Sequence, residues 1–152
     1  MRIGLMASVT DDPNASFDEV INNAKQAEVE GFDSLWMANI FGIDAISTLA
    51  IIGRETETLR LGTAVTPTYP RHPAARAQQA LTTAVACQGR FNLGIGLSHK
   101  AGMEDMSGMA YDKPARHMRQ YLRALTPISM GETAHFDGEQ YRVHGVKIAV
   151  PG

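Results

Sequence analysis

Two polar segments of this chain carry side chains that could do chemistry, and each follows an apolar run. The first is segment 66–73, TPTYPRHP. Its hydroxyls and the imidazole of His72 could hydrogen-bond a ligand, and the planar guanidinium of Arg71 suits a carboxylate or a phosphate. The second segment is 98–100, SHK, which adds the hydroxyl of Ser98 and the imidazole of His99. Both segments predict a polar ligand site.

The elements around these segments predict where they lie. The apolar run 59–65 predicts a strand, and Pro73 suits the first turn of a following helix. The run 90–95 predicts a second strand, which ends in Gly94-Ile95-Gly96. Because α/β barrels place their chemistry in loops at the carboxyl ends of their strands, we expect the two polar segments to lie at one end of a sheet.

Upstream, the same alternation of strand and helix occurs twice. Runs 2–6 and 32–38 predict strands, the first broken by Gly4. In the second, the continuous apolar residues 35–37 are typical of a strand covered on both faces. Ser16 and Glu19 form a capping box that opens a first helix, which should end at Gly31. Asp44 is the expected cap of a second helix, which should end near residues 53–56.

Downstream, a longer loop at 97–113, rich in Met and Gly, is a candidate mobile lid. Pro114 opens a fourth helix, which Pro127 and Gly131 should end. Its inward face should consist of Met118, Tyr121, Leu122 and Leu125, as that of the third helix should consist of Ala74, Ala77, Ala80, Leu81 and Ala84. The tail 134–150 predicts a β-hairpin around Asp137-Gly138.

Four strand-helix units in series predict a parallel sheet, because each crossover helix returns the chain to the same end of the sheet. An open doubly wound sheet and half of an eight-stranded barrel both fit this pattern. We find no linker, so residues 1–152 are expected to form a single domain.

Composition narrows the class of protein. The formal net charge of −2 gives no general attraction to nucleic acid or to an anionic membrane. No apolar run approaches the ~20 residues of a membrane span, and no leader pattern opens the chain. The single cysteine, Cys87, cannot form an internal disulfide and is expected to be a buried apolar residue. A cytoplasmic location is the expectation.

A set of short segments in fixed order resembles the bacterial-luciferase-like monooxygenase family, and most of all its branch that uses the deazaflavin coenzyme F-420 (also written F420). The segments are 31–36 (GFDSLW), 61–67 (LGTAVTP), 71–73 (RHP), 89–91 (GRF), 93–96 (LGIG) and 111–117 (YDKPARH). The resemblance implies a (β/α)8 TIM barrel. It also implies that this chain holds about four of the βα units plus the hairpin, without strands five to eight.

The resemblance further assigns roles to residues. It implies that Trp36 lines the pocket of a flat isoalloxazine-type ring and that the Ala64-Val65 peptide is cis behind that ring. The other implied cofactor contacts are Thr63, Thr66, Arg71, Gly96, Ser98 and Tyr111. His72 and His99 are the candidate catalytic residues, His99 as an acid. The start of the fourth helix could hold a cofactor phosphate, because backbone amides at a helix amino end attract anions.

Two other types of site are not indicated. Gly94-Ile95-Gly96 lacks the third glycine of a dinucleotide fingerprint, and no helix follows it at once. It is better interpreted as a strand end where a ligand can approach the backbone. The five histidines show no ligand spacing with cysteine or carboxylates, so no metal site is expected.

Three functional hypotheses remain open. The first is a luciferase-like oxidoreductase, truncated or split, that moves a hydride between F-420 or FMN and a small organic substrate; with a flavin it would reduce molecular oxygen as a monooxygenase. The second is a non-catalytic half-barrel that folds as a homodimer or with a complementary chain, because unpaired strand edges favour association. A nucleotide-binding open sheet is third, and the lack of a Gly-rich first turn argues against it.

Overall fold

The computed structural model describes residues 1–7, 14 and 16–151. The chain forms two compact units. Unit 1 comprises Met1–Thr66 and Thr82–Ile95, and unit 2 comprises Pro67–Leu81 and Gly96–Gly152. The α3 helix (Pro73–Ala86) contributes to both, since its first nine residues belong to unit 2 and the rest to unit 1. None of the helices in the described part of the chain has the length and apolar character that crossing a membrane requires.

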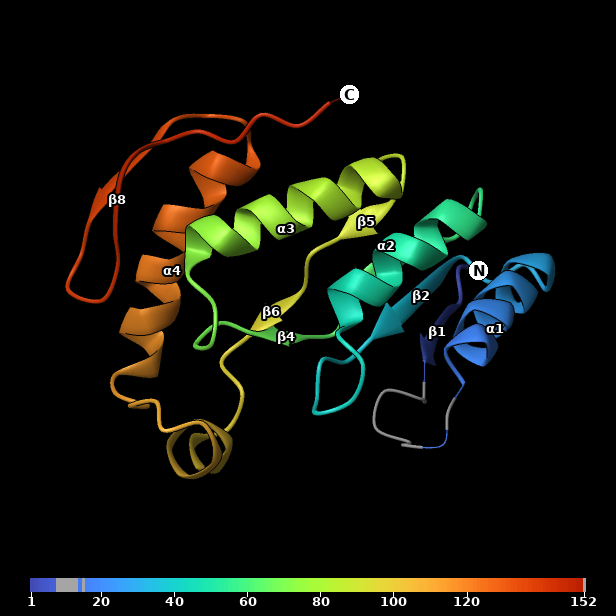
Figure 1. Cartoon of the computed structure of the whole chain (residues 1–152), viewed down its shortest axis with the longest axis horizontal. Coiled ribbons are helices and arrows are strands. Elements are labelled where there is room, and N and C mark those ends of the chain that lie inside the picture. The colour runs from blue at the N-terminus through green and yellow to red at the C-terminus, as the bar shows by residue number, and fades with distance from the viewer. Residues whose placement is uncertain (8–13, 15, 152) are drawn as a thin grey trace. The chain divides into compact units, whose positions relative to one another are not determined.

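Unit 1 is built on a parallel sheet of four strands in the order β1-β2-β3-β5. The strands are β1 (Gly4–Ala7), β2 (Ser34–Met37), β3 (Arg60–Thr63) and β5 (Phe91–Asn92). Leu5, Leu35, Leu61 and Phe91 lie in one register across the sheet. The prediction of four parallel strands is therefore confirmed, and Figure 1 shows β1 and β2 side by side.

The fourth predicted strand, 90–95, is wrong as one continuous strand. It forms two short ones, β5 and β6 (Ile95–Gly96), and β6 pairs with β4 (Thr66–Pro67). The cause is at Gly94, whose N–H donates to the Thr63 hydroxyl at 2.9 Å while that hydroxyl donates to the Gly94 carbonyl at 2.7 Å. A side chain thus takes the backbone groups that would otherwise continue the ladder with β3.

The helices of unit 1 begin where the capping residues predict. The Ser16 amide donates to the Glu19 carboxylate at 3.1 Å at the start of α1 (Phe17–Val29). The Asp44 carboxylate accepts from the Ser47 amide at 2.8 Å at the start of α2 (Ala45–Glu55). Gly31 follows α1 with a φ of +82°, a left-handed conformation that glycine adopts at little cost.

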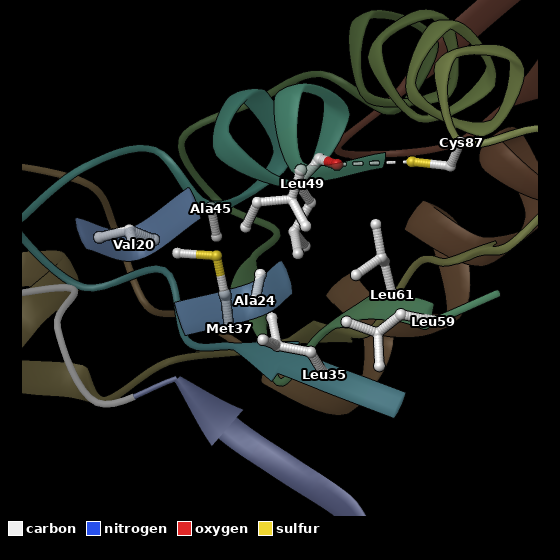
Figure 2. Close-up of a cluster of buried hydrophobic side chains, with 10 residues drawn as sticks. Val20, Ala24, Leu35, Met37, Ala45, Leu49, Leu59, Leu61 and Cys87 are labelled. Carbon is white, nitrogen blue, oxygen red and sulfur yellow. Dashed lines mark hydrogen bonds between the residues drawn. The ribbon is translucent and has the colours of Figure 1, made fainter. Parts of the chain in front are cut away.

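The core of unit 1 lies between one face of the sheet and its helices. Figure 2 shows Val20 and Ala24 of α1 and Leu49 of α2 over Leu35 and Leu61 of the sheet. The Cys87 thiol donates to the Leu49 carbonyl at 3.5 Å, and burial raises the pKa of the thiol. The expectation of a buried cysteine is confirmed.

Unit 2 follows the predicted order with one addition. The predicted loop 97–113 contains a π-helical turn, η1 (Gly102–Met106), in which Met103 is buried. The helix α4 (Pro114–Ser129) comes next. The predicted hairpin is confirmed as the antiparallel pair β7 (Ala134–Asp137) and β8 (Arg142–Val146).

Two details of the helices differ from the prediction. Pro127 lies inside α4, because a proline in the last turn still has helical φ; the chain turns only at Gly131, with a φ of +76°. Leu122 is 43% exposed, because it lies about 100° around the helix from the buried Tyr121. On α3, Ala77 and Ala80 are buried as predicted, and so are Arg76 and Thr83, which are polar and were not expected there.

Candidate functional site

Trp36 defines the second face of the unit 1 sheet. Successive residues of a strand point to opposite faces, so Leu35 and Met37 face the helices while Ser34 and Trp36 face the other side. The indole Nε1 of Trp36 donates to the Ser34 hydroxyl at 3.0 Å, which fixes the ring orientation. Trp36 is only partly buried, so part of this residue remains accessible.

Glycines on both neighbouring strands leave room for this ring. A Cβ at Gly62 would lie 2.3 Å from Cζ3 of Trp36, and one at Gly4 would lie 3.3 Å from its Nε1. Met6, Trp36 and Gly62 share one register across β1, β2 and β3. The indole therefore extends over the backbone of both flanking strands and forms a broad flat surface.

The chain leaves β3 through an irregular segment whose Ala64-Val65 peptide is cis, as the resemblance implied. Its backbone is tied to the loop after β2, because Asn39 N–H donates to the Val65 carbonyl at 3.2 Å and Ala64 N–H to the Met37 carbonyl at 2.8 Å. Ala64 and Val65 are exposed, the latter by 44%. An exposed apolar pair on an anchored backbone can pack against a flat ring.

The two threonines beside this peptide differ in what their hydroxyls can do. The Thr63 hydroxyl is hydrogen-bonded to both backbone groups of Gly94, so it holds the backbone at this position. Thr66 is 1% exposed, and its Oγ1 has no hydrogen-bond partner among the described residues. Buried polar atoms are nearly always hydrogen-bonded, so the Thr66 hydroxyl is the polar group here with a bond left to make.

In unit 2, Arg71 and His72 are both engaged by the start of α3. The Arg71 guanidinium donates to the Gln79 side-chain carbonyl. The Nδ1 of His72 accepts from the Ala74 amide at 3.2 Å, so this imidazole caps the first turn of the helix. His72 itself is exposed, and its ring lies edge-on to Tyr141 at 5.7 Å. His72 therefore has a structural role at the start of this helix.

The structure also brings together Ser98 and Tyr111, two of the predicted cofactor residues. The Tyr111 hydroxyl donates to the Ser98 carbonyl at 3.2 Å, and Ser98 has a φ of +62°. The Gly96 carbonyl accepts from the Thr68 amide at 2.9 Å. His99 is exposed. Ser98 thus contacts its neighbour through the backbone, which leaves its side chain exposed.

The sequence did not predict a cluster of aromatic rings in unit 2. The Tyr69 ring stacks on His117 with centroids 3.7 Å apart and on Tyr111 with centroids 5.1 Å apart. The Nε2 of His117 lies 2.9 Å from the Thr68 hydroxyl. Tyr121 and Tyr141 complete the cluster, with centroids 5.9 and 5.5 Å from His117. The one signal was that His117 and Tyr121 are one helical turn apart on an amphipathic helix.

Burial determines the charge states in this cluster. It lowers the pKa of His117, so the imidazole is neutral at pH 7. It raises the pKa of Tyr121, an effect that the nearby guanidinium of Arg76 opposes. Arg76 is buried and donates to the Pro67 carbonyl at 2.9 Å. In the described part of the chain, no three His, Cys, Asp or Glu side chains are grouped closely enough to hold a metal ion.

The family is shown by a model for luciferase-like monooxygenases, which matches residues 1–151. The chain belongs to this family. A curated member, the 5,10-methylenetetrahydromethanopterin reductase of Archaeoglobus fulgidus, is 31% identical over 137 residues, which are 90% of this chain and 41% of the relative. The F420-dependent glucose-6-phosphate dehydrogenase of Mycolicibacterium smegmatis is 33% identical over 145 residues, 86% of this chain and 43% of the relative.

Solved structures show the same fold. The coenzyme F420-dependent tetrahydromethanopterin reductase of Methanopyrus kandleri superposes with a TM-score of 0.82 at 20% identity, over 97% of this chain and 46% of that one. The oxygenating constituent of 3,6-diketocamphane monooxygenase from Pseudomonas putida, in complex with FMN, has a TM-score of 0.81 at 22% identity, over 94% of this chain and 43% of that one. These luciferase-like enzymes are TIM barrels, and this chain has the fold of about half of the barrel.

The luciferase-like chain therefore spans less than half the length of the curated relatives it matches. Its parallel order of strands agrees with the barrel rather than with the open doubly wound sheet that the sequence pattern also allowed.

Proposed function

We propose that this chain supplies the part of a luciferase-like oxidoreductase that holds a flat redox cofactor, with F-420 favoured over FMN, for hydride transfer to or from a small organic substrate. The observation that carries the proposal is the buried Thr66 hydroxyl without a partner among the described residues, next to the exposed Ala64-Val65 pair. All three residues belong to unit 1, as does Trp36.

The residues of unit 1 fit such a cofactor chemically. A deazaflavin or flavin ring is flat, largely apolar on its faces and carries carbonyl oxygens at its edge. Trp36 and Val65 offer apolar surface for a ring face, while the Thr66 O–H can donate to an acceptor at the ring edge. The backbone bonds from Asn39 and Ala64 hold this segment in place before a ligand arrives. Such preorganisation reduces the entropy lost on binding.

The relatives support F-420 over FMN. The F420-dependent glucose-6-phosphate dehydrogenase is 33% identical to this chain, whereas the FMN complex is matched at 22% identity and supports only the fold. When bound, either cofactor supplies the redox chemistry, and a deazaflavin restricts it to hydride transfer. The protein residues then have to bind and orient the ring and keep water from it.

A titration tests this proposal. Trp36 is the only tryptophan, so quenching of its fluorescence by F-420 or FMN reports binding beside this residue. We expect F-420 to bind with a Kd below ~10 μM, about −7 kcal/mol. Thr66→Val keeps the shape and removes the hydroxyl, so the affinity should fall about fivefold to tenfold, as for one hydrogen bond of about 1 kcal/mol. Thr48→Val is the matched control.

The control differs from the test variant in one respect. The Thr48 hydroxyl already donates to the Asp44 carbonyl at 2.8 Å, so Thr48→Val should lower stability and leave cofactor affinity unchanged. Thr66→Val should lower the cofactor affinity and leave stability unchanged. Absence of any binding by a folded wild-type chain would reject the cofactor proposal, and equal affinities of the two variants would reject the role of Thr66.

A second proposal, pairing with a second copy or a complementary chain, is supported by the edge of the sheet. Strand β1 has one neighbour, β2, among the described strands, so its outer edge is open for pairing. A groove of about 270 Å³ lies beside it and is lined by β1 and α1 residues, including Leu5, Ala7 and Val20. Ile3 and Met6 are about half exposed there.

Light scattering tests the pairing proposal independently of the cofactor. We expect the purified chain to have at least twice its monomer mass of 16.5 kDa. Met6→Lys places a charge at this edge and should shift the mass towards the monomer, whereas Met130→Lys, at an exposed methionine of unit 2, should not. A monomeric wild-type chain that is fully folded would contradict this proposal.

A further inference from the structure

The hydroxyl of Tyr69 is buried and lacks a hydrogen-bond partner within the described residues. The ring that carries it is held firmly, by stacking on His117 with an interplanar angle of 7° and on Tyr111 with an angle of 25°. A phenol in such a position normally has a partner, because an unsatisfied buried polar group destabilises the fold. The neighbouring tyrosine of the same cluster, Tyr121, follows this rule and donates to the Arg71 carbonyl at 3.1 Å.

The position of the Tyr69 ring is supported by contacts of its neighbours. The Thr68 hydroxyl lies 2.9 Å from Nε2 of His117, and the Thr68 amide donates to the Gly96 carbonyl at 2.9 Å. Thr68 itself is fully buried. The residue before Tyr69 and both stacking partners are thus anchored, so the phenol is oriented before a ligand binds. Such preorganisation is typical of groups that determine specificity.

We propose that Tyr69 is a specificity-determining residue whose hydroxyl donates a hydrogen bond to a neutral carbonyl oxygen of the substrate. This inference rests on the proposed oxidoreductase function and names the group by which its small organic substrate is recognised. A phenol keeps its proton at neutral pH and can therefore donate; burial, Tyr111 and Asp112 raise the pKa of Tyr69 further.

The same surroundings select against an anionic ligand. A carboxylate or phosphate at the Tyr69 hydroxyl would be repelled by the negative charge of Asp112, which is close enough to influence the phenol. The guanidinium of Arg71, the predicted anion-binding group, is already bonded to Gln79. A ketone, aldehyde or amide oxygen accepts the same hydrogen bond without this repulsion.

The test compares Tyr69→Phe with Tyr121→Phe, using cyclohexanone labelled with ¹³C at the carbonyl as the probe and cyclohexanecarboxylate as the anionic competitor. Hydrogen bonding moves the carbonyl carbon resonance downfield, so the shift on binding reports the bond itself. We expect wild-type protein to give this shift. Tyr69→Phe should abolish it and weaken cyclohexanone binding about fivefold or more, as expected for one hydrogen bond. Cyclohexanecarboxylate should not displace the ketone.

Thermal unfolding provides the second readout. Tyr69→Phe keeps the stacked ring, so its unfolding midpoint should be unchanged or higher, whereas Tyr121→Phe should lower the midpoint because it removes a bonded hydroxyl. An equal loss of stability in both variants would show that the Tyr69 hydroxyl has a protein partner and overturn the inference. Cyclohexanone binding or a carbonyl shift that is the same in Tyr69→Phe as in wild type would also overturn it.

The outcome is separable from that of the cofactor proposal. Cofactor titration of the wild-type chain decides whether F-420 or FMN binds, and the ketone experiment requires neither. If the wild-type chain binds F-420 but Tyr69→Phe and Tyr121→Phe give the same cyclohexanone binding and carbonyl shift, the proposed function stands and this inference is rejected. If the carbonyl shift depends on Tyr69 but no cofactor binds, the ketone site stands and the proposed redox function is rejected.

Discussion

The six-membered ring of Trp36 lies over the Cα of Gly62 on the neighbouring strand, so closely that a Cβ at that position would be 2.3 Å from Cζ3. This contact explains how a large aromatic residue fits on the sheet face opposite the helices. The neighbouring strand provides backbone, not a side chain, beneath the indole. The proposed ring-binding surface therefore depends on a glycine that makes no contact of its own with a ligand.

Gly62→Ala should displace the indole, because the added methyl group and the ring cannot occupy the same space. We expect a loss of about 1–3 kcal/mol in the free energy of unfolding, the usual cost of overpacking. The emission maximum of Trp36 should shift at the same time. Urea unfolding followed by fluorescence measures both. Gly102→Ala is the control, since its nearest neighbour would be 3.8 Å away, and it should change neither quantity.

Glu28 should make the stability of unit 1 depend on acidic pH. Burial alone would raise its pKa, but the amides of Thr58, Leu59 and Glu57 and the Thr58 hydroxyl outweigh this effect and lower the pKa to about 2. A carboxyl whose pKa is lower in the folded state stabilises the fold above its ordinary value near 4.5. That stability, on the order of 2 kcal/mol, is lost as the pH falls from about 4.5 towards 2.

Glu28→Gln should remove most of this pH dependence, because an amide cannot titrate. At pH 7 the variant should be less stable than wild type, since a neutral acceptor binds the three amides more weakly. Chemical denaturation at pH 7 and at pH 3 measures the difference. Glu57→Gln, at an exposed side chain beside the same loop, should leave the pH dependence intact, and a similar flattening there would contradict the assignment to Glu28.

Arg90 should be intolerant of lysine. Its Nη1 and Nη2 atoms donate to the carbonyls of Gly53, Thr56 and Leu59, and so satisfy the end of α2 and the start of β3. A lysine has one nitrogen and cannot reach this arc of acceptors. We expect Arg90→Lys to lose about 2–3 kcal/mol of unfolding free energy, measured in urea, from unsatisfied buried carbonyls. Arg54→Lys, at an exposed position in the last turn of α2, should lose less than about 0.5 kcal/mol.

His117 should make unit 2 less stable in mild acid. Burial lowers its pKa in the folded state, so below the ordinary value near 6.5 the unfolded chain binds a proton that the folded chain does not. Stability should then fall by at most about 1.4 kcal/mol per pH unit as the pH drops from 6.5 towards the folded pKa. His117→Phe keeps an aromatic ring beside Tyr69 and should flatten this dependence.

The matched variant for that experiment is His135→Asn, at an exposed residue of β7. This variant should lose as much stability between pH 7 and 5 as the wild type does. Tyrosine absorbance during thermal unfolding measures this loss. His117→Phe should also be less stable at pH 8, because it loses the hydrogen bond with Thr68. A wild-type protein whose stability is constant over this pH range would contradict the neutral, buried state of His117.

Local signals in the sequence were sufficient for most of the fold. The capping box at Ser16, the cap at Asp44 and the glycine after α1 act within a few residues, so they correctly place the helix ends. The fourth strand was predicted as continuous because apolar residues recur at every second position, 91, 93 and 95. Its interruption depends on Thr63, 31 residues away in the sequence, whose hydroxyl takes the backbone groups of Gly94.

The candidate site was harder to predict for the same reason. Motif resemblance made Trp36, Thr66 and Tyr111 candidate cofactor residues, because their segments have a recognisable order in the chain. It gave no indication that Tyr69 stacks on His117, which lies 48 positions further along. Residue type alone also did not distinguish Thr63 from Thr66, because they differ only in whether the hydroxyl has a partner among the residues that the structure describes.

The division of the chain into two units separates its ultraviolet chromophores. The single tryptophan belongs to unit 1, while all four tyrosines, at positions 69, 111, 121 and 141, belong to unit 2. Each unit thus carries its own optical label without any chemical modification. Tryptophan fluorescence excited at the red edge of the absorption band follows unit 1 alone, and the tyrosine signal follows unit 2. A single denaturation experiment therefore reveals whether the two units unfold together or one after the other.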